Sequence, residues 1–210
     1  RARPDGVLLA RTVLDVSRAV AWCAANKVPF VARGAGTNLS GGCVPLRGGL
    51  VISLARMDRI LSLDIAARAA CVEPGVVNLV LQREAEKVGL FYAPDPASFR
   101  VCTIGGNAAE NAGGPRCLKY GVTTNHVLAV EAVMPDGAVV RFSLEDGGPE
   151  MTSLLIGSEG TLGVLTKIWV KLTPLPEETR TILAGFSSIA AAVECVSAVI
   201  AAGVLPRCLE

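Results

Sequence analysis

Three short glycine-rich segments carry the residue types in this sequence that are best suited to holding a ligand. They span 34–42, 105–114 and 157–163, and together they hold eleven of the 22 glycines. Glycine permits positive φ angles and lets another group approach the backbone amides closely. Small polar side chains stand between these glycines and can donate or accept hydrogen bonds. The pattern predicts ligand-binding loops, with tight structural turns as the alternative.

The first segment has the composition of an anion-binding loop. In RGAGTNLSGG, residues 33–42, successive backbone amides can turn inward and form a concave anion site. Thr37, Asn38 and Ser40 add neutral donors. A diphosphate held in this way needs few basic residues, which agrees with a net charge of only +1. The alternative is a tight turn after a strand.

Two common nucleotide motifs do not match this segment. A P-loop requires a lysine near its end, and residues 36–42 contain none. A dinucleotide fold of the GxGxxG type requires a third glycine and an immediate helix, whereas Gly36 is followed by TNL and later by Pro45. An NTPase and an NAD-binding dehydrogenase of that fold are therefore not expected.

The other two segments suit the remaining parts of a nucleotide-like ligand. A flat apolar ring could lie against the small residues of 103–114, with Thr103, Asn107 and Asn111 bonding its polar edge. The alternative there is a loop with asparagine-stabilised turns. Glu159 stands among small residues before a buried strand, where a carboxylate can accept ribose hydroxyls. A helix cap or an exposed charge is the alternative for Glu159.

Composition restricts the class of protein that presents these loops. The 210 residues are 51% hydrophobic and only 19% charged, so the chain can bury a substantial core. The balanced charge gives no electrostatic case for binding nucleic acid or an anionic membrane. Seven cysteines occur without a CxxC pair, which favours buried thiols in a reducing compartment over a disulfide framework or an iron–sulfur site.

Helical and strand patterns alternate along the first 175 residues. Thr12 and Asp15 form a capping box that starts a helix, which ends before Val28–Pro29. A second helix carries Val77, Leu81 and Ala85 on one face. The hydrophobic pattern predicts strands over 30–32, 50–54, 60–65, 69–72, 127–134, 138–143 and 164–172. Pro135–Asp136–Gly137 predicts a hairpin turn between two of these strands.

The last 35 residues resemble the opening of a second unit. Pro174 and Pro176 mark a linker, followed by a predicted strand over 181–186 and an alanine-rich helix capped by Ser187 or Ser188. Glu194 near the middle of that helix argues against a membrane span. No signal peptide is expected, and the first residue, Arg, leads us to expect a part of a longer protein.

Six motifs follow one another in an order that resembles the FAD-linked oxidase family, which has the vanillyl-alcohol-oxidase (PCMH-type) flavin fold. They lie at 33–42, 73–75, 94–98, 103–114, 119–121 and 156–164. Within that family the chain is similar to the branch of glycolate oxidase flavin subunits, D-lactate dehydrogenases and D-2-hydroxyglutarate dehydrogenases. The resemblance implies an α+β FAD-binding domain of two α+β subdomains over 1–175. The beginning of a substrate cap domain would follow over 176–210.

The resemblance also implies which residues hold FAD. By motif position the pyrophosphate would lie against Arg33, Gly34, Ala35, Gly36, Thr37, Asn38, Leu39 and Ser40. The flavin and ribityl region would be lined by Pro74, Pro94, Ser98, Thr103, Gly106, Asn107, Ala109 and Gly113, and the adenosine half by Glu159, Gly163 and Val164. Relatives that attach flavin covalently often carry histidine where Thr37 stands, so noncovalent FAD is expected.

The function implied by the resemblance is oxidation of a small D-2-hydroxy acid, glycolate or D-lactate, by hydride transfer to flavin N5. Electrons would then pass to an iron–sulfur subunit, an electron-transferring flavoprotein or quinone, in the cytoplasm or peripherally at the inner face of the membrane through a partner. The family's histidine-rich segment, which supplies metal ligands and the catalytic base, has no counterpart here, and the single histidine, His126, is expected to be structural. No catalytic or metal-binding residue is therefore assigned, and these 210 residues alone are expected to be inactive.

Two other hypotheses for the function remain open from the sequence. The stretch before Gly157 is short, and Gly148–Pro–Glu–Met151 replaces a longer segment that ends in Gly–Tyr–Asp–Leu in most relatives. This difference favours a non-catalytic flavin-binding or electron-relay module of a larger complex, whereas histidine and arginine ligands further along the gene would favour the enzyme. The third hypothesis, after the enzyme and the non-catalytic module, is a plain α/β domain whose glycines only form turns.

Overall fold

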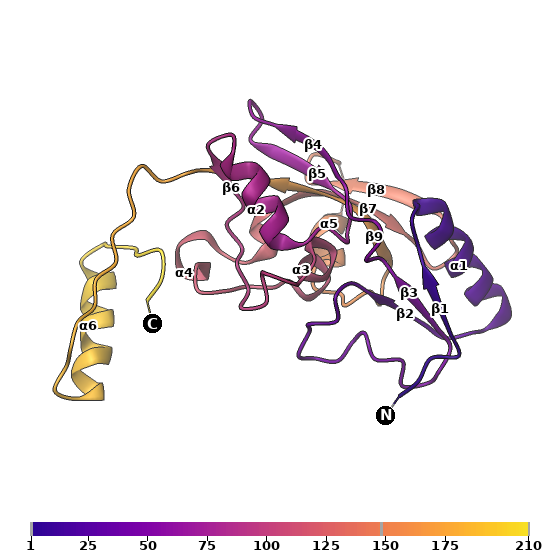
Figure 1. Cartoon of the computed structure of the whole chain (residues 1–210), viewed down its shortest axis with the longest axis horizontal. Coiled ribbons are helices and arrows are strands. Elements are labelled where there is room, and N and C mark those ends of the chain that lie inside the picture. The colour runs from indigo at the N-terminus through magenta and orange to yellow at the C-terminus, as the bar shows by residue number, and fades with distance from the viewer. Residues whose placement is uncertain (1, 148, 210) are drawn as a thin grey trace.

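The N-terminal part of the protein is built on a small parallel sheet. The computed structural model describes residues 2–147 and 149–209. Strands β1 (Gly6–Leu9), β3 (Leu50–Ser53) and β2 (Phe30–Arg33) lie in the order β1-β3-β2. Helix α1 (Val13–Asn26) covers one face of this sheet (Figure 1). Strand β1 is absent from the sequence prediction, although its three consecutive apolar residues were a usable signal.

The start of α1 confirms the predicted capping box. The amide of Asp15 donates to Thr12 Oγ1 at 3.2 Å, and the amide of Thr12 donates to Asp15 Oδ2 at 3.0 Å. Val16 and Val20 are fully buried against the sheet, where they pack in one cluster with Ile52. The same cluster includes Val133 and Val164 of the second sheet, so one apolar core joins the two sheets.

The second sheet is antiparallel and has five strands in the order β4-β5-β9-β7-β8. Its strands are β4 (Ile60–Asp64), β5 (Ala69–Val72), β9 (Val164–Lys171), β7 (Val127–Val133) and β8 (Val139–Ser143). The predicted hairpin is confirmed, because β7 and β8 pair and the amide of Gly137, at φ 87°, donates to the Met134 carbonyl. Helices α2 (Asn78–Glu86), α3 (Ile104–Glu110) and α5 (Met151–Leu155) contribute apolar side chains to the core of this sheet. The predicted α+β class is therefore correct.

Short elements complete the body of the molecule. Strand β6 (Leu90–Phe91) pairs with β10 (Thr173–Pro174), while α4 (Cys117–Tyr120) and the 3₁₀ turn η1 (Thr123–His126) connect α3 to β7. The replaced stretch before Gly157 includes Gly148, which lies outside the described residues. Its end forms α5, where the Glu150 carboxylate accepts the amide of Ser153 as an N-cap.

The predicted strand over 181–186 is wrong. These residues have no regular structure, and Ile182 and Leu183 are 89% and 98% exposed. A strand needs a neighbour for its backbone groups, and none of the described strands lies beside this segment. Helix α6 (Ile189–Ala201) is present and capped by Ser188 as predicted.

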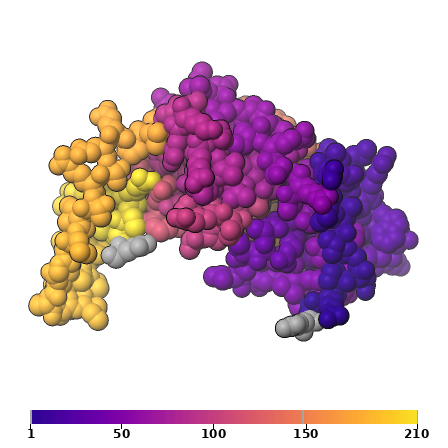
Figure 2. Space-filling view, in the orientation of Figure 1, coloured from indigo at the N-terminus to yellow at the C-terminus, as the bar shows by residue number. Residues whose placement is uncertain are grey.

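The segment that carries α6 stands away from the body along most of its length (Figure 2). A boundary near residue 175 remains a prediction. Among the described helices, none combines the length and apolar character needed to cross a membrane.

Glu73 is a buried carboxylate that anchors the Glu73–Pro74–Gly75 motif. It accepts the backbone amide of Arg59 at 2.9 Å and the Nε and Nη2 of that guanidinium at 3.2 and 2.8 Å. Burial by itself raises the pKa of Glu73, but the hydrogen bonds from Arg59 outweigh it and hold the pKa below its usual value. Ionised Glu73 therefore stabilises the fold at pH values above the pKa that Glu73 has in the unfolded chain.

We expect Glu73→Gln to lower the free energy of unfolding at neutral pH by about 1–3 kcal/mol, because charge-assisted hydrogen bonds are lost. The difference from wild type should shrink as the pH falls below about 4.3, where Glu73 of the unfolded chain takes up a proton, and should vanish once native Glu73, whose pKa is lower, is protonated as well. Urea unfolding at several pH values measures both effects. Glu84→Gln is the control, since Glu84 pairs with Lys87 on the surface and should change stability by less than about 0.5 kcal/mol. Equal effects of the two substitutions would contradict the prediction.

Candidate functional site

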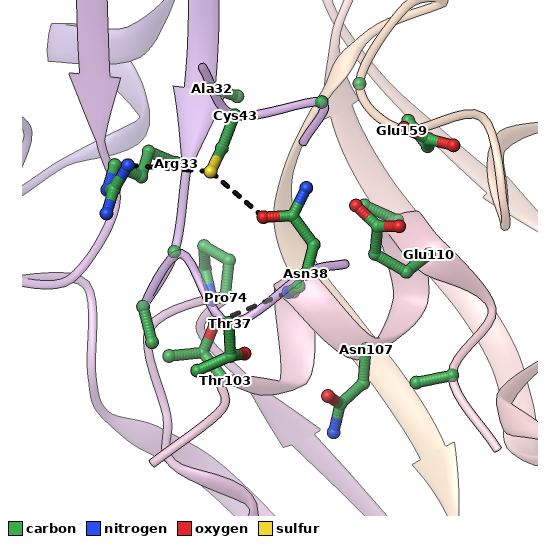
Figure 3. Close-up of a pocket in the computed structure, with 18 of the residues that line it drawn as sticks. Ala32, Arg33, Thr37, Asn38, Cys43, Pro74, Thr103, Asn107, Glu110 and Glu159 are labelled. Atoms are coloured by element: carbon green, nitrogen blue, oxygen red, sulfur yellow. Dashed lines mark hydrogen bonds between the residues drawn. The ribbon is translucent and has the colours of Figure 1, made fainter. Parts of the chain in front are cut away.

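The three glycine-rich segments meet around one cavity of about 450 Å³ (Figure 3). Seventeen of the nineteen residues predicted to bind the cofactor line it: Arg33, Gly34, Ala35, Gly36, Thr37, Asn38, Leu39, Ser40, Pro74, Ser98, Thr103, Gly106, Asn107, Ala109, Glu159, Gly163 and Val164. The other two, Pro94 and Gly113, are not part of the lining. The cavity lies between the loop that follows β2 and the N-terminal half of α3, and its size is typical of ligand sites.

The loop after β2 presents an unbroken run of unused backbone donors. No backbone N–H of residues 34–43 donates a hydrogen bond within the described part of the chain. Gly36 adopts φ 75° and Gly41 φ 82°, which bend the loop in a way that other residues rarely tolerate. A concave run of free amides is suited to phosphate oxygens. The geometry therefore agrees with the anion-binding interpretation of this segment.

Side chains of the loop bond to one another and hold its shape. The Cys43 thiol donates to Asn38 Oδ1 at 3.0 Å, and Arg33 Nη1 donates to Cys43 Sγ at 3.5 Å (Figure 3). Cys43 also lines the cavity and was not among the predicted residues. It directly follows Gly42, and this adjacency was the signal that could have included it.

The second glycine-rich segment begins as a helix and not as the loop with asparagine-stabilised turns that was one alternative expected from the sequence. Thr103 caps α3, and its Oγ1 accepts the amide of Gly106 at 3.3 Å. Gly105 packs so closely on Pro74 that a Cβ at this position would overlap that residue. The helix therefore tolerates two consecutive glycines because tertiary packing favours it, in spite of their poor helix propensity.

Asn107 on α3 places a donor at the cavity without a partner. Its side chain is 3% exposed, and Nδ2 has no hydrogen-bond partner among the described residues. Leaving such a group unpaired costs about 1–3 kcal/mol. A ligand acceptor in the cavity would satisfy it, which agrees with the predicted role of Asn107 at the polar edge of a ring.

Two carboxylates bring the first and third segments together. Ser40 Oγ lies 3.0 Å from Glu110 Oε2 and 3.0 Å from Glu159 Oε2, and its single proton can serve one of them at a time. The amide of Glu159 donates to the Ala109 carbonyl at 2.9 Å, which fixes the turn of the third segment on the end of α3. Glu110 was missed by the sequence analysis, although it stands one helical turn after Asn107.

The loop that includes Pro94 and Ser98 is fixed to the start of α2. Asn78, which is fully buried, donates from Nδ2 to the Pro94 carbonyl at 3.0 Å and accepts from Gln82 Nε2 at 2.7 Å. The amide of Asn78 also donates to the Cys102 carbonyl. Pro94 is thereby held behind the cavity wall, while Ser98 reaches it.

His126 lies outside the cavity lining and has structural surroundings. It is 5% exposed, and its Nε2 donates to the Tyr120 carbonyl at 2.8 Å. Burial lowers the pKa of His126, which keeps the ring neutral at physiological pH. These contacts agree with the expected structural role.

The donors and acceptors around the cavity fit an extended dinucleotide cofactor. Free amides of 34–43 can hold a diphosphate, the glycines of α3 leave room for a flat ring, and Asn107 Nδ2 offers a donor to it. The carboxylates of Glu110 and Glu159 can accept hydroxyl groups. Together with the two-sheet α+β fold, this arrangement defines a flavin-type nucleotide-binding protein rather than a P-loop or GxGxxG protein.

The family is shown by direct comparison. The family model described as "FAD binding domain" matches residues 4–143, and the chain belongs to this family. Over its whole length the chain is 44% identical to the glycolate oxidase subunit GlcD of Bacillus subtilis. It is 36% identical, again over its whole length, to a D-lactate dehydrogenase of Anaerostipes hadrus. The resemblance recognised from the motifs is therefore confirmed.

Solved structures show the same fold. An alkyldihydroxyacetonephosphate synthase superposes on 96% of this chain with a TM-score of 0.82 at 26% identity, over 40% of its own length. The 6-hydroxy-D-nicotine oxidase of Arthrobacter nicotinovorans superposes on 94% of this chain with a TM-score of 0.77 at 27% identity, over 44% of its own length. The chain spans 46% and 45% of the two curated relatives above, which is about half their length.

Proposed function

We propose that this chain is the FAD-binding part of a flavoprotein that oxidises a small D-2-hydroxy acid, of the glycolate or D-lactate type, to the 2-keto acid. The observation that carries the proposal is the run of free amides over 34–43 facing a cavity with an unpaired donor at Asn107. The names of the relatives at 44% and 36% identity support the substrate class.

Each part of the cavity has a task in this proposal. The amides of 34–43 bind the diphosphate, Asn107 orients the flavin ring through Nδ2, and Glu159 accepts a ribose hydroxyl. Bound FAD supplies the acceptor for the hydride of the substrate's α-carbon. Thr37 lacks a nucleophilic ring nitrogen, so FAD is held noncovalently. The remainder of the protein supplies the catalytic base.

We infer further that residues 1–175 form the FAD-binding domain and that 176–210 begin the domain that covers the substrate. Electrons leave through a partner, an iron–sulfur subunit, an electron-transferring flavoprotein or quinone, on the cytoplasmic side of the membrane. Two observations support this inference: the GlcD relative is named as a subunit, and α6 exposes Ile189 and Val193 at 85% and 60%.

The first test is the absorption spectrum of the purified full-length protein, repeated on the supernatant after acid denaturation. We expect a flavin spectrum that is released into the supernatant and is bleached by glycolate or D-lactate before denaturation. If flavin is released but no D-2-hydroxy acid bleaches it, the protein is a flavin-binding module that lacks this activity. A colourless protein that takes up no FAD would refute the proposal.

A matched pair of glycine variants tests the amide loop. Gly36→Ala and Gly41→Ala place alanine at similar positive φ angles, 75° and 82°, so their backbone strain is comparable, although a Cβ at position 36 would also displace the Arg33 side chain. Only Gly36 lines the cavity. We expect Gly36→Ala to weaken FAD binding by about tenfold or more and Gly41→Ala by less than about threefold, measured by fluorescence titration of the apoprotein. Equal effects would show that the loop acts only through stability.

A further inference from the structure

Glu110 is a cavity residue to which the proposed function gives no task. It is the last residue of α3, it is half-buried, and it lines the cavity together with Glu159. Figure 3 shows the Glu110 carboxylate directed towards Asn38 of the loop over 34–43. Glu110 therefore stands where the helix, this loop and the third glycine-rich segment meet.

The side chains of Glu110 and Glu159 can accept more hydrogen bonds than the chain supplies. In the described part of the chain their only protein donor is Ser40 Oγ, which lies 3.0 Å from each carboxylate and has a single proton. Over residues 2–147 and 149–209 no lysine or arginine nitrogen lies within 4 Å of either carboxylate. Most of their acceptor capacity is therefore left for a ligand or for water.

The backbone holds both carboxylates at the same end of α3. Glu159 adopts φ 52°, in the left-handed region, which is unfavourable for a residue with a Cβ. Its amide donates to the Ala109 carbonyl at 2.9 Å, so the residue next to Glu110 holds Glu159 in this conformation. Strained backbone of this kind persists where surrounding contacts fix it, and it is concentrated at ligand sites and active sites.

Asn107 is independent evidence that the cavity receives a ligand with hydrogen-bonding groups. It lies one helical turn before Glu110, it is 3% exposed, and its Nδ2 has no partner among the described residues. The donor of Asn107 requires an acceptor, whereas the carboxylate of Glu110 requires donors. The ligand must therefore present both acceptors and donors along one wall of the cavity.

The charges at this wall decide which donors face Glu110. Ser40 belongs to the run of free amides suited to a diphosphate, and its hydroxyl touches both carboxylates. A phosphate placed against Glu110 and Glu159 would be repelled, most strongly where water is partly excluded. Neutral hydroxyl groups are attracted instead, and their bonds to a carboxylate are stronger than bonds between neutral groups. Within the described residues no third His, Cys, Asp or Glu joins the two carboxylates to form a metal site.

We propose that Glu110, together with Glu159, binds two neighbouring sugar hydroxyls of the cofactor. This inference rests on the proposed function, because it takes FAD as the occupant of the cavity. FAD carries neighbouring hydroxyls on its adenosine ribose and on its ribityl chain, and each of these sugars adjoins the diphosphate. The ribose is the sugar already assigned to Glu159. One hydroxyl donates to each carboxylate, so that Ser40 no longer has to serve both.

The test measures cofactor binding to the FAD-free full-length protein by fluorescence titration. FAD is compared with two analogues, one that contains 2′,3′-dideoxyadenosine and one whose ribityl chain is replaced by an alkyl chain. We expect Glu110→Ala to raise the dissociation constant of FAD by about 10- to 100-fold and to leave that of the analogue without the bonded hydroxyls unchanged. Glu110→Gln should lose less, since its amide oxygen still accepts. Glu84→Ala, at a surface glutamate paired with Lys87, is the matched control and should change none of the three.

The pattern of losses identifies the sugar and separates this inference from the proposed function. An effect that disappears only with the dideoxyadenosine analogue supports the inference and assigns the ribose, and one that disappears only with the alkyl analogue supports it and assigns the ribityl chain. Equal losses with all three cofactors would show that Glu110 acts only on the loop through Ser40, and would overturn the inference. Unchanged affinity of Glu110→Ala for FAD would overturn it as well. A wild-type protein that binds none of the three would instead overturn the proposed function.

Discussion

Replacing Gly105 with alanine is expected to lower the free energy of unfolding by about 2–3 kcal/mol and to reduce the flavin content of the purified protein to background. A Cβ at this position would lie 2.8 Å from Pro74 Cα and 2.9 Å from the Pro74 carbonyl oxygen, both backbone atoms. Pro74 cannot move away easily, because its carbonyl accepts the amide of Gly105 and the adjacent Gly75 amide donates to Met57 at 2.7 Å. Helix α3 must therefore shift, and it carries Asn107 on the cavity wall.

Gly106→Ala is the matched control for the stability part of this prediction only, because Gly106 itself lines the cavity. The neighbouring position has a helical backbone, and a Cβ there meets only Thr103 Oγ1, at 3.3 Å. Alanine should keep or slightly raise the stability of the apoprotein, by up to about 1 kcal/mol, because it favours a helix more than glycine does. Urea unfolding of both apoproteins measures the difference in stability, and the flavin content of purified Gly105→Ala measures the second effect. A Gly105→Ala protein as stable as wild type would contradict the close packing described here.

The second large effect is expected at Asn107. We predict that Asn107→Leu weakens FAD binding by about 10- to 100-fold while changing the stability of the apoprotein by less than about 1 kcal/mol. The side chain is buried and Nδ2 has no partner in the described chain, so its removal costs the apoprotein little and costs the complex a hydrogen bond. Fluorescence titration and urea unfolding give the two quantities separately.

Asn111→Ala should show the opposite order of effects, with a larger change in apoprotein stability than in FAD binding. Asn111 ends α3 at φ 49°, and its Oδ1 accepts the amide of Thr124 at 2.9 Å. Loss of this bond, together with an unfavourable left-handed alanine, should destabilise the apoprotein by about 1–2 kcal/mol. If Asn107→Leu destabilises the apoprotein as much as Asn111→Ala does, the unpaired donor has a structural role instead of a ligand-binding one.

Local signals in the sequence predicted the elements whose hydrogen bonds close over a few residues. The capping box of Thr12 and Asp15 spans four residues, and the turn at Gly137 closes over a similar distance. Predictions that required a partner elsewhere were less successful. The strand over 181–186 failed because nothing lies beside it, and Gly105 is helical because of Pro74 rather than its own propensity.

The sequence by itself determined the order of the motifs, the family, the α+β class and the loop rich in free amides, because these depend on residue type and short spacing. Only the tertiary structure decided which groups meet in the cavity. Ser40 reaches Glu110 across 70 residues and Glu159 across 119. Such contacts have no local signature, since they arise from the packing of two sheets. The unpaired donor of Asn107 is likewise a property of its surroundings, because an asparagine is unpaired only when the fold buries it without an acceptor.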